Sequence, residues 1–293
     1  MFYGLNLSWH LSLFNLIFIV ALYLLYAFGI RFTGRNQAEH EPIRVRKIVA
    51  FIIAILAMAL VLLTPFDTIA RTQLFIAHMG QAVVLTTVCA PLLLLACPSW
   101  LLLPLVNLPV VRTIVRVLTQ PVIASAIFNL NFLIWHAPGL FNFALANSTF
   151  YHVEMLSFLF TSLLNWWPLI GPVRELRRLS YPQQMLYAFL DGQPVDIFAF
   201  LLVFSGVVFY PHYIVPPQLG ISAFADQAAG GALLLLPGLV DLLVMTPLFF
   251  YWLRQIEEKA KLNDERLQQL ADAEAAMAEA EEMEGEDINI NRA

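Results

Sequence analysis

The sequence predicts an all-α, polytopic membrane protein with seven transmembrane helices. Hydrophobic residues make up 60% of the 293 residues and charged residues only 13%, whereas about a quarter of the residues in a soluble domain are charged. Seven apolar stretches are each long enough to cross a bilayer, which takes a helix of about 20 residues. They are residues 11–30, 48–66, 73–97, 120–137, 151–171, 185–210 and 229–253.

The stretch between the third and fourth predicted crossings is apolar but interrupted. It contains Pro104, Pro109, Arg112 and Arg116 within residues 98–118. Prolines break helices, and arginines are costly in hydrocarbon. We therefore expect an interfacial or re-entrant segment here and not an eighth crossing.

The basic residues predict the orientation, with the N-terminus outside and the C-terminus in the cytoplasm. Of the 16 lysines and arginines, 15 fall in the first, third and fifth loops and in the tail, and the remaining one is Arg71. Basic residues concentrate on the cytoplasmic side of membrane proteins. The N-terminus lacks the features of a cleaved signal peptide, so we expect the first helix to be retained.

The chain divides into a seven-helix transmembrane domain, residues 1–253, and an acidic cytoplasmic tail, residues 254–293. From Glu257 onward there are 12 acidic and 4 basic residues, a net charge of 4 − 12 = −8. The tail is rich in helix-forming residues, but Asn263 and Glu274 interrupt its apolar face. We expect a helix that either docks a partner or is a solvated stalk, with a disordered end at 285–293. No patch typical of nucleic-acid binding is present.

Side chains that bind metals gather at the predicted outer ends of the crossings. Imidazole and thioether groups together suit copper, because thioethers select Cu(I) and imidazole accepts a wider range of metals. His152 and Met155 are three residues apart and share a helical face. The layer contains His10, His78, Met79, His136, His152, Glu154, Met155, His212, Asp226 and Gln227.

The same histidines have a structural interpretation, because amphipathic rings often lie at the level of the lipid headgroups. We expect this for His10 and His212, whereas His78, His136 and His152 lie at the ends of three successive crossings. Two histidines on facing helices could also hold a b-type haem, which is a third alternative.

Three carboxylates lie inside predicted crossings: Asp191, Asp196 and Asp241. Charge at this depth is costly and indicates either a proton or cation role or a structural polar network. Cys89 and Cys97 lie toward the other end of their crossing from the histidines, so we expect no shared metal ligation between them.

Several short motifs resemble the CtaG family of cytochrome c oxidase assembly factors, over residues 70–240. They are His78-Met79-Gly80-Gln81, Ala90-Pro91-Leu92-Leu93-Leu94, Trp135-His136-Ala137-Pro138, Glu154 and Phe158 with Trp166-Trp167-Pro168, and Asp226-Gln227 followed by Gly230-Gly231 and Pro237-Gly238. The resemblance implies a seven-helix protein of the bacterial inner membrane that supports copper delivery to the oxidase. It is not expected to be an enzyme, and its partners would be terminal oxidase subunits and the lipid bilayer.

The resemblance also implies which residues bind copper. His78 and His136 match family histidines, whereas Ala82 and Met155 stand where the family pattern has further histidines. The expected copper site therefore consists of His78, Met79, His136, His152 and Met155, with Asp226 as a supporting carboxylate. The alternative function is a non-catalytic accessory or structural subunit of a respiratory complex that has lost the usual ligands.

Overall fold

A computed structural model describes residues 4–35, 44–176 and 179–290 and contains only helices and loops within them. Arg177, Arg178 and Arg292, which are among the basic residues of the predicted loops and tail, lie outside these residues. The α-helices are α1 (Leu13–Arg35), α2 (Val45–Leu63), α3 (Pro65–Thr72), α4 (Phe75–Val83), α5 (Ala90–Ala96), α6 (Ser99–Val106), α7 (Pro109–Leu118), α8 (Pro121–Trp135), α9 (Pro138–Ala146), α10 (Ser148–Ile170), α11 (Tyr181–Phe204), α12 (Ala223–Leu234) and α13 (Pro237–Ile290).

The chain is a multi-pass membrane protein by the length and composition of its helices. Six helical stretches in the described residues are long and apolar enough to cross a membrane, and two bent pairs raise the possible number to eight. The pair α6 and α7 is bent by 115°, and the pair α8 and α9 by 71°. The predicted seven falls inside this range, and the number of crossings and their direction stay predictions.

Local sequence signals explain where the helices begin. Proline lies at the start of α3, α7, α8 and α9, where its missing N–H is not needed. The Asn147 side chain accepts hydrogen bonds from the N–H groups of Thr149 and Phe150 at the start of α10, as an N-cap does. Ser180 and Gln183 form a capping box at the start of α11.

The third predicted crossing is one helix with a π-helical segment, Val84–Cys89, between α4 and α5. Such segments free backbone carbonyls and often occur at functional sites. The Thr86 carbonyl accepts hydrogen bonds from Ser162 Oγ at 2.7 Å and from Trp166 Nε1 at 2.9 Å, both on α10. These bonds fix α10 against the middle of the third predicted crossing.

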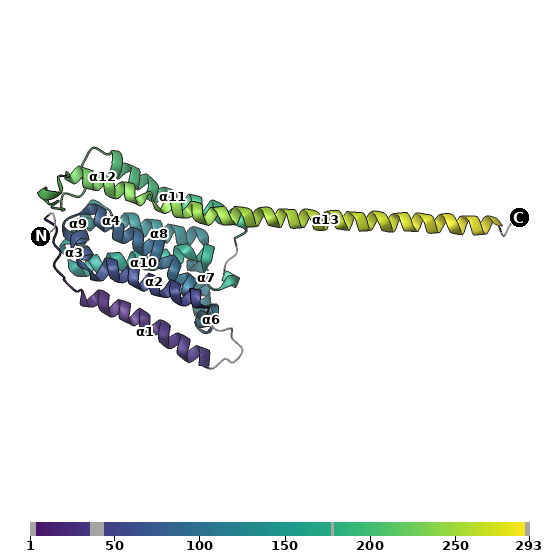
Figure 1. Ribbon diagram of the computed structural model, residues 1–293, viewed down its shortest axis with the longest axis horizontal. Helices are drawn as coiled ribbons and strands as arrows, with labels where there is room; N and C mark the ends of the chain where they lie inside the picture. Colours follow the sequence, from purple (N-terminus) through teal and green to yellow (C-terminus); the bar gives the residue numbers. More distant parts are fainter. Residues whose placement is uncertain (1–3, 36–43, 177–178, 291–293) are drawn as a thin grey trace.

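The helices pack into a bundle from which one end of α13 projects (Figure 1). The main core lies between α2, α4, α8, α10 and α11, and its largest buried side chains include Phe75, Phe141, Tyr151 and Phe158. Helix α1 lies at the edge of the bundle and is mostly exposed, as expected for a helix that faces lipid. The large aromatic side chains of the core gather near the starts of α4 and α10.

Helix α12 packs closely on α4 and α11 through two glycines. A Cβ atom at Gly230 would lie 2.5 Å from the Phe75 ring, and one at Gly231 would lie 2.9 Å from the backbone oxygen of Ala199. Small residues let membrane helices approach closely in this way. The contact brings the start of α12 next to the start of α4.

The predicted tail is part of α13, which is helical from Pro237 to Ile290. The side chains of residues 254–277 are exposed, and this part of the helix extends beyond the bundle (Figure 1). The disorder predicted for 285–293 stays a prediction, and residues 291–293 are outside the described part of the chain.

Candidate metal centre

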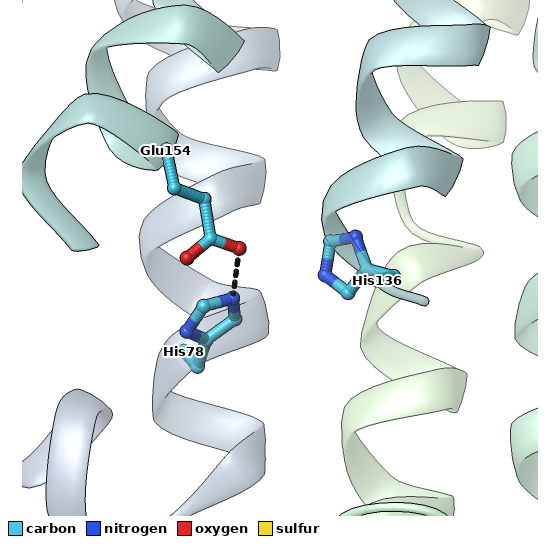
Figure 2. A group of neighbouring side chains, drawn as sticks. All are labelled: His78, His136 and Glu154. Carbon is cyan, nitrogen blue, oxygen red and sulfur yellow. Dashed lines mark ion pairs between the residues drawn. The ribbon is translucent and has the colours of Figure 1, made fainter. Parts of the chain in front are cut away.

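Two histidines and a glutamate from three helices meet inside the bundle. His78 closes the first turn of α4, His136 follows the last residue of α8, and Glu154 lies in the second turn of α10. One potential ligand atom from each lies within 4.8 Å of the others. Figure 2 shows His78 and Glu154 pointing toward each other, with His136 on the neighbouring helix.

The polar atoms of this cluster have almost no hydrogen-bond partners. The side chains of His78, His136 and Glu154 are 0%, 2% and 0% exposed. Both nitrogens of His78, Nε2 of His136 and both carboxylate oxygens of Glu154 are buried without a hydrogen bond, although His78 Nε2 and Glu154 Oε1 lie at ion-pair distance. Burying such groups unpaired costs several kcal/mol, so the arrangement is incomplete as a purely structural network.

The distances fit a shared ion in part. His78 Nε2 lies 3.4 Å from Glu154 Oε1, and two ligands of one tetrahedral ion with bonds of about 2.1 Å are separated by about 3.4 Å. The limit of 4.8 Å for the whole set is wider. All three atoms can bind one ion only where each separation is about 4.2 Å or less, twice the bond length.

The orientation of His136 leaves one nitrogen free for a ligand. Its Nδ1 lies 2.7 Å from the backbone oxygen of Phe132, and because a carbonyl can only accept, Nδ1 must carry the proton. The lone pair is then on Nε2, which faces no other partner. A backbone carbonyl that fixes the imidazole in this way is the usual support of a metal-binding histidine.

Aromatic rings surround the cluster and exclude water. The His136 ring stacks on Phe132 at 4.3 Å and on Phe158 at 5.6 Å between ring centroids. The Phe141 and His78 rings meet edge to face, with their centroids 4.8 Å apart. Such a shell lowers the local dielectric constant and strengthens electrostatic interactions inside it.

Residues outside the cluster hold its helices in place. Both oxygens of Asp226 accept hydrogen bonds from the first N–H groups of α4, those of Phe75 at 2.7 Å and Ile76 at 3.1 Å. Asp226 therefore anchors the helix that carries His78 and lies outside the three-residue cluster. The Tyr210 hydroxyl donates to the backbone oxygen of His136 at 2.7 Å.

A hydrogen-bonded chain links the cluster region to an open pocket of the protein. The Tyr151 hydroxyl donates to Gln81 Oε1, and Gln81 Nε2 donates to Asp67 Oδ1 at 3.0 Å. The Tyr151 ring lies 5.8 Å from His78, and Asp67 lines an open pocket. Asp67 lies on α3, outside the membrane-spanning helices, and its burial raises the pKa of its carboxyl group to about 6.

His152 does not join the other two predicted histidines. Its Nε2 lies 3.0 Å from Ser12 Oγ and its Nδ1 lies 3.3 Å from Asn15 Nδ2, so it faces α1. Residues 152 and 154 are about 200° apart around a helix. Because Glu154 faces the cluster, His152 must face away from it.

The two predicted thioether ligands lie in the surrounding core. Met79 and Met155 are fully buried, and a Cβ atom at Gly230 would lie 3.2 Å from Met79 Cγ, so the Met79 side chain packs toward α12. His10 and His212 are exposed. Of the ligands expected from the sequence, only His78 and His136 belong to the buried cluster, and the structure adds Glu154 to them.

Sequence reasoning placed Glu154 in the outer layer but left it out of the expected ligands. It is the single carboxylate in the predicted crossing 151–171, and a carboxylate in a membrane helix is by default a functional candidate. The sequence therefore contains a signal for Glu154 as a functional residue. The roles of Gln81, Tyr151 and Tyr210 depend on tertiary contacts and had no comparable signal.

The intramembrane carboxylates form a separate polar cluster on the cavity between α8, α10, α11 and α13. Asp191 Oδ1 accepts from Asn129 Nδ2 at 3.2 Å, and Asp191 Oδ2 accepts from Asn165 Nδ2. Asp196 and Asp241 line the same cavity, of about 70 Å³. These contacts of Asp191 fit a structural polar network, which is one of the two interpretations that the sequence leaves open; the other is a proton or cation role.

Comparison with curated proteins and with solved structures gave no match. A family comparison matched residues 21–255, which include every residue of the buried cluster and most of the membrane bundle. The matched family is described as cytochrome c oxidase caa3 assembly factor (Caa3_CtaG). The chain therefore belongs to the Caa3_CtaG family of cytochrome c oxidase assembly factors.

Proposed function

We propose that this protein assists the biogenesis of a haem-copper cytochrome c oxidase by holding copper at His78, His136 and Glu154 as cargo for delivery. The observation that carries the proposal is the set of buried ligand atoms without hydrogen-bond partners. Copper is the preferred cargo because sites with nitrogen and oxygen ligands bind Cu²⁺ more tightly than other divalent ions of the first transition row. Imidazole ligands also suit copper.

The proposed role of each residue follows from its surroundings. His136 would bind through Nε2, because Nδ1 donates to the Phe132 carbonyl. Glu154 would supply negative charge that compensates the cation, and His78 lies 3.4 Å from it. Asp226 positions α4 through its two backbone hydrogen bonds. Met79 and Met155 remain candidates for thioether ligands to Cu(I).

We also propose a seven-crossing topology in a bacterial inner membrane, with the N-terminus outside and the tail in the cytoplasm. The support is the distribution of basic residues and the 115° bend between α6 and α7, which suits an interfacial or re-entrant segment. In this topology the cluster lies near the outer face.

The test is the copper content of the full-length protein, purified in detergent and loaded under oxidising and under reducing conditions. We expect about one copper per chain for the wild type, and loss of most of it in His78→Ala, His136→Ala and Glu154→Gln. His212→Ala is the matched control, because His212 is exposed, and it should keep its copper. A wild type without copper in both conditions would refute the proposal.

The accessory-subunit alternative gives a different result. In that case the protein would co-purify with an oxidase in fixed stoichiometry, and His78→Ala and His136→Ala would leave both the association and the copper content of the oxidase unchanged. A transient assembly factor instead predicts an oxidase that lacks copper in those variants.

A further inference from the structure

The second half of α13 is an unsupported helix outside the bundle. From Arg254 to Met277 every side chain is exposed, and none of the other helices in the described part of the chain lies beside this segment (Figure 1). Single helices gain most of their stability from packing an apolar face against another element. We therefore expect another surface to cover its apolar side chains.

Five apolar residues and one asparagine on α13 follow a heptad pattern at alternating steps of three and four. The positions are Leu253, Ile256, Ala260, Asn263, Leu267 and Leu270. This is the a/d pattern of a coiled coil, with Leu253, Ala260 and Leu267 at a and the other three at d. Glu274 occupies the next a position and ends the apolar seam.

The same pattern continues in phase into the membrane part of α13. Leu239, Leu242, Thr246 and Phe249 occupy the preceding a and d positions, and all four are exposed. This face of α13 is therefore not the one that packs on α11. A second helix can lie along it without meeting the bundle.

The charged residues beside the seam favour a parallel pair of identical helices. Lys259 occupies a g position and Asp264 the following e position. In a parallel dimer the g residue of one chain lies beside this e residue of the other, so Lys259 and Asp264 form two interchain pairs by symmetry. The intrachain pair Lys261–Glu265, at 3.9 Å, lies on the outer face and is left undisturbed.

The membrane restricts the possible partners further. Two copies inserted in one membrane with the same orientation extend their tails in the same direction, so only parallel pairing is available to them. Anchoring also raises their effective concentration, which lets a short seam associate. Asn263 at one d position favours one register over others, as buried polar residues do in coiled coils.

We infer that residues 253–270 of α13 pair with the same segment of a second copy as a parallel two-stranded coiled coil. The protein is then a dimer joined by its stalk, with two separate membrane bundles. This inference does not depend on copper binding or on the side of the membrane that the stalk faces.

Cysteine cross-linking of the full-length chain in its membrane tests the pairing directly. In a Cys89→Ala, Cys97→Ala background, Leu270→Cys places a thiol at a d position and should give a disulfide-linked dimer under mild oxidation. Asp272→Cys, at the outer f position, is the matched control and should stay monomeric. Equal cross-linking of both variants, or none with Leu270→Cys, would overturn the inference.

Charge reversal tests the register and the orientation. Lys259→Glu replaces both interchain attractions by repulsion and should raise the dissociation constant in detergent about tenfold. Adding Asp264→Lys should restore wild-type affinity. A double variant as weak as the single one would contradict the parallel register, and an unchanged dissociation constant in Lys259→Glu would contradict the seam itself. These variants lie outside the bundle, so its folding is not affected.

Discussion

At the scale of single residues, the site depends on which face of α10 points inward. His152 and Met155 share a helical face, and this made His152 the natural third ligand from sequence. The structure instead turns Glu154 toward His78 and gives His152 hydrogen-bond partners on α1. Residue types and spacing identify candidate metal ligands near the predicted outer ends of the crossings. Which side of the helix faces the core depends on packing that a single sequence does not specify.

Asp67 gives a pH prediction at this scale. Burial, partly offset by the hydrogen bond from Gln81, raises the pKa of Asp67 from 3.8 to about 6. The folded chain therefore binds this proton more tightly than the unfolded chain, so Asp67 favours folding most below pH 4. Stability then falls as the pH rises toward 6, by at most about 3 kcal/mol.

The measurement is the midpoint of thermal unfolding in detergent between pH 4 and pH 7, for the wild type and for Asp67→Asn. Other groups titrate equally in both proteins, so the difference isolates Asp67. The wild type should lose stability relative to the variant as the pH rises through this window. Parallel pH profiles would contradict the prediction.

At the scale of the helices, hydrophobicity and proline placement were informative. The predicted stretch 151–171 corresponds to α10 (Ser148–Ile170), and 48–66 to α2 (Val45–Leu63). The stretch 185–210 corresponds to α11 (Tyr181–Phe204), which begins and ends earlier, and Gly206 just after it has a positive φ of 67°. The π-helical segment Val84–Cys89 had no sequence signal, since it depends on how α10 contacts its carbonyls.

The glycine contact of α12 gives a prediction for a helix interface. Gly231→Ala would bring a Cβ atom to 2.9 Å from the backbone oxygen of Ala199. Backbone cannot move aside locally, so we expect a loss of about 1–3 kcal/mol of stability. Gly238→Ala is the control, because no atom lies within 4 Å of its Cβ position. Thermal unfolding of both variants checks this, and an equal effect would show that the contact is not tight.

At the scale of the whole molecule, the sequence predicts an integral membrane protein because its apolar runs are long and nearly free of charge. The exact number of crossings is harder to predict. Helix α8 has only 15 residues, and α6 and α7 are short and separated by a 115° bend. Whether such a segment crosses the membrane depends on its depth in the bilayer, which neither its helix propensity nor its length specifies.

The proposed orientation gives a whole-molecule prediction. A fluorescent protein fused after Ala293 should fluoresce, because it would fold in the cytoplasm, and alkaline phosphatase at the same position should be inactive. Fusions after Pro216, in the loop between α11 and α12, should give the opposite pattern. An active phosphatase at the C-terminus would reverse the orientation derived from the basic residues.

The cluster of His78, His136 and Glu154 is closed to solvent on every side, since its side chains are 0–2% exposed. An ion held there can leave only when aromatic neighbours such as Phe141 or Tyr151 move. Its residence time would then be governed by the frequency of local opening more than by the strength of its ligand bonds. A recipient protein that loosens these rings could release the cargo on contact, without binding the metal more tightly at first.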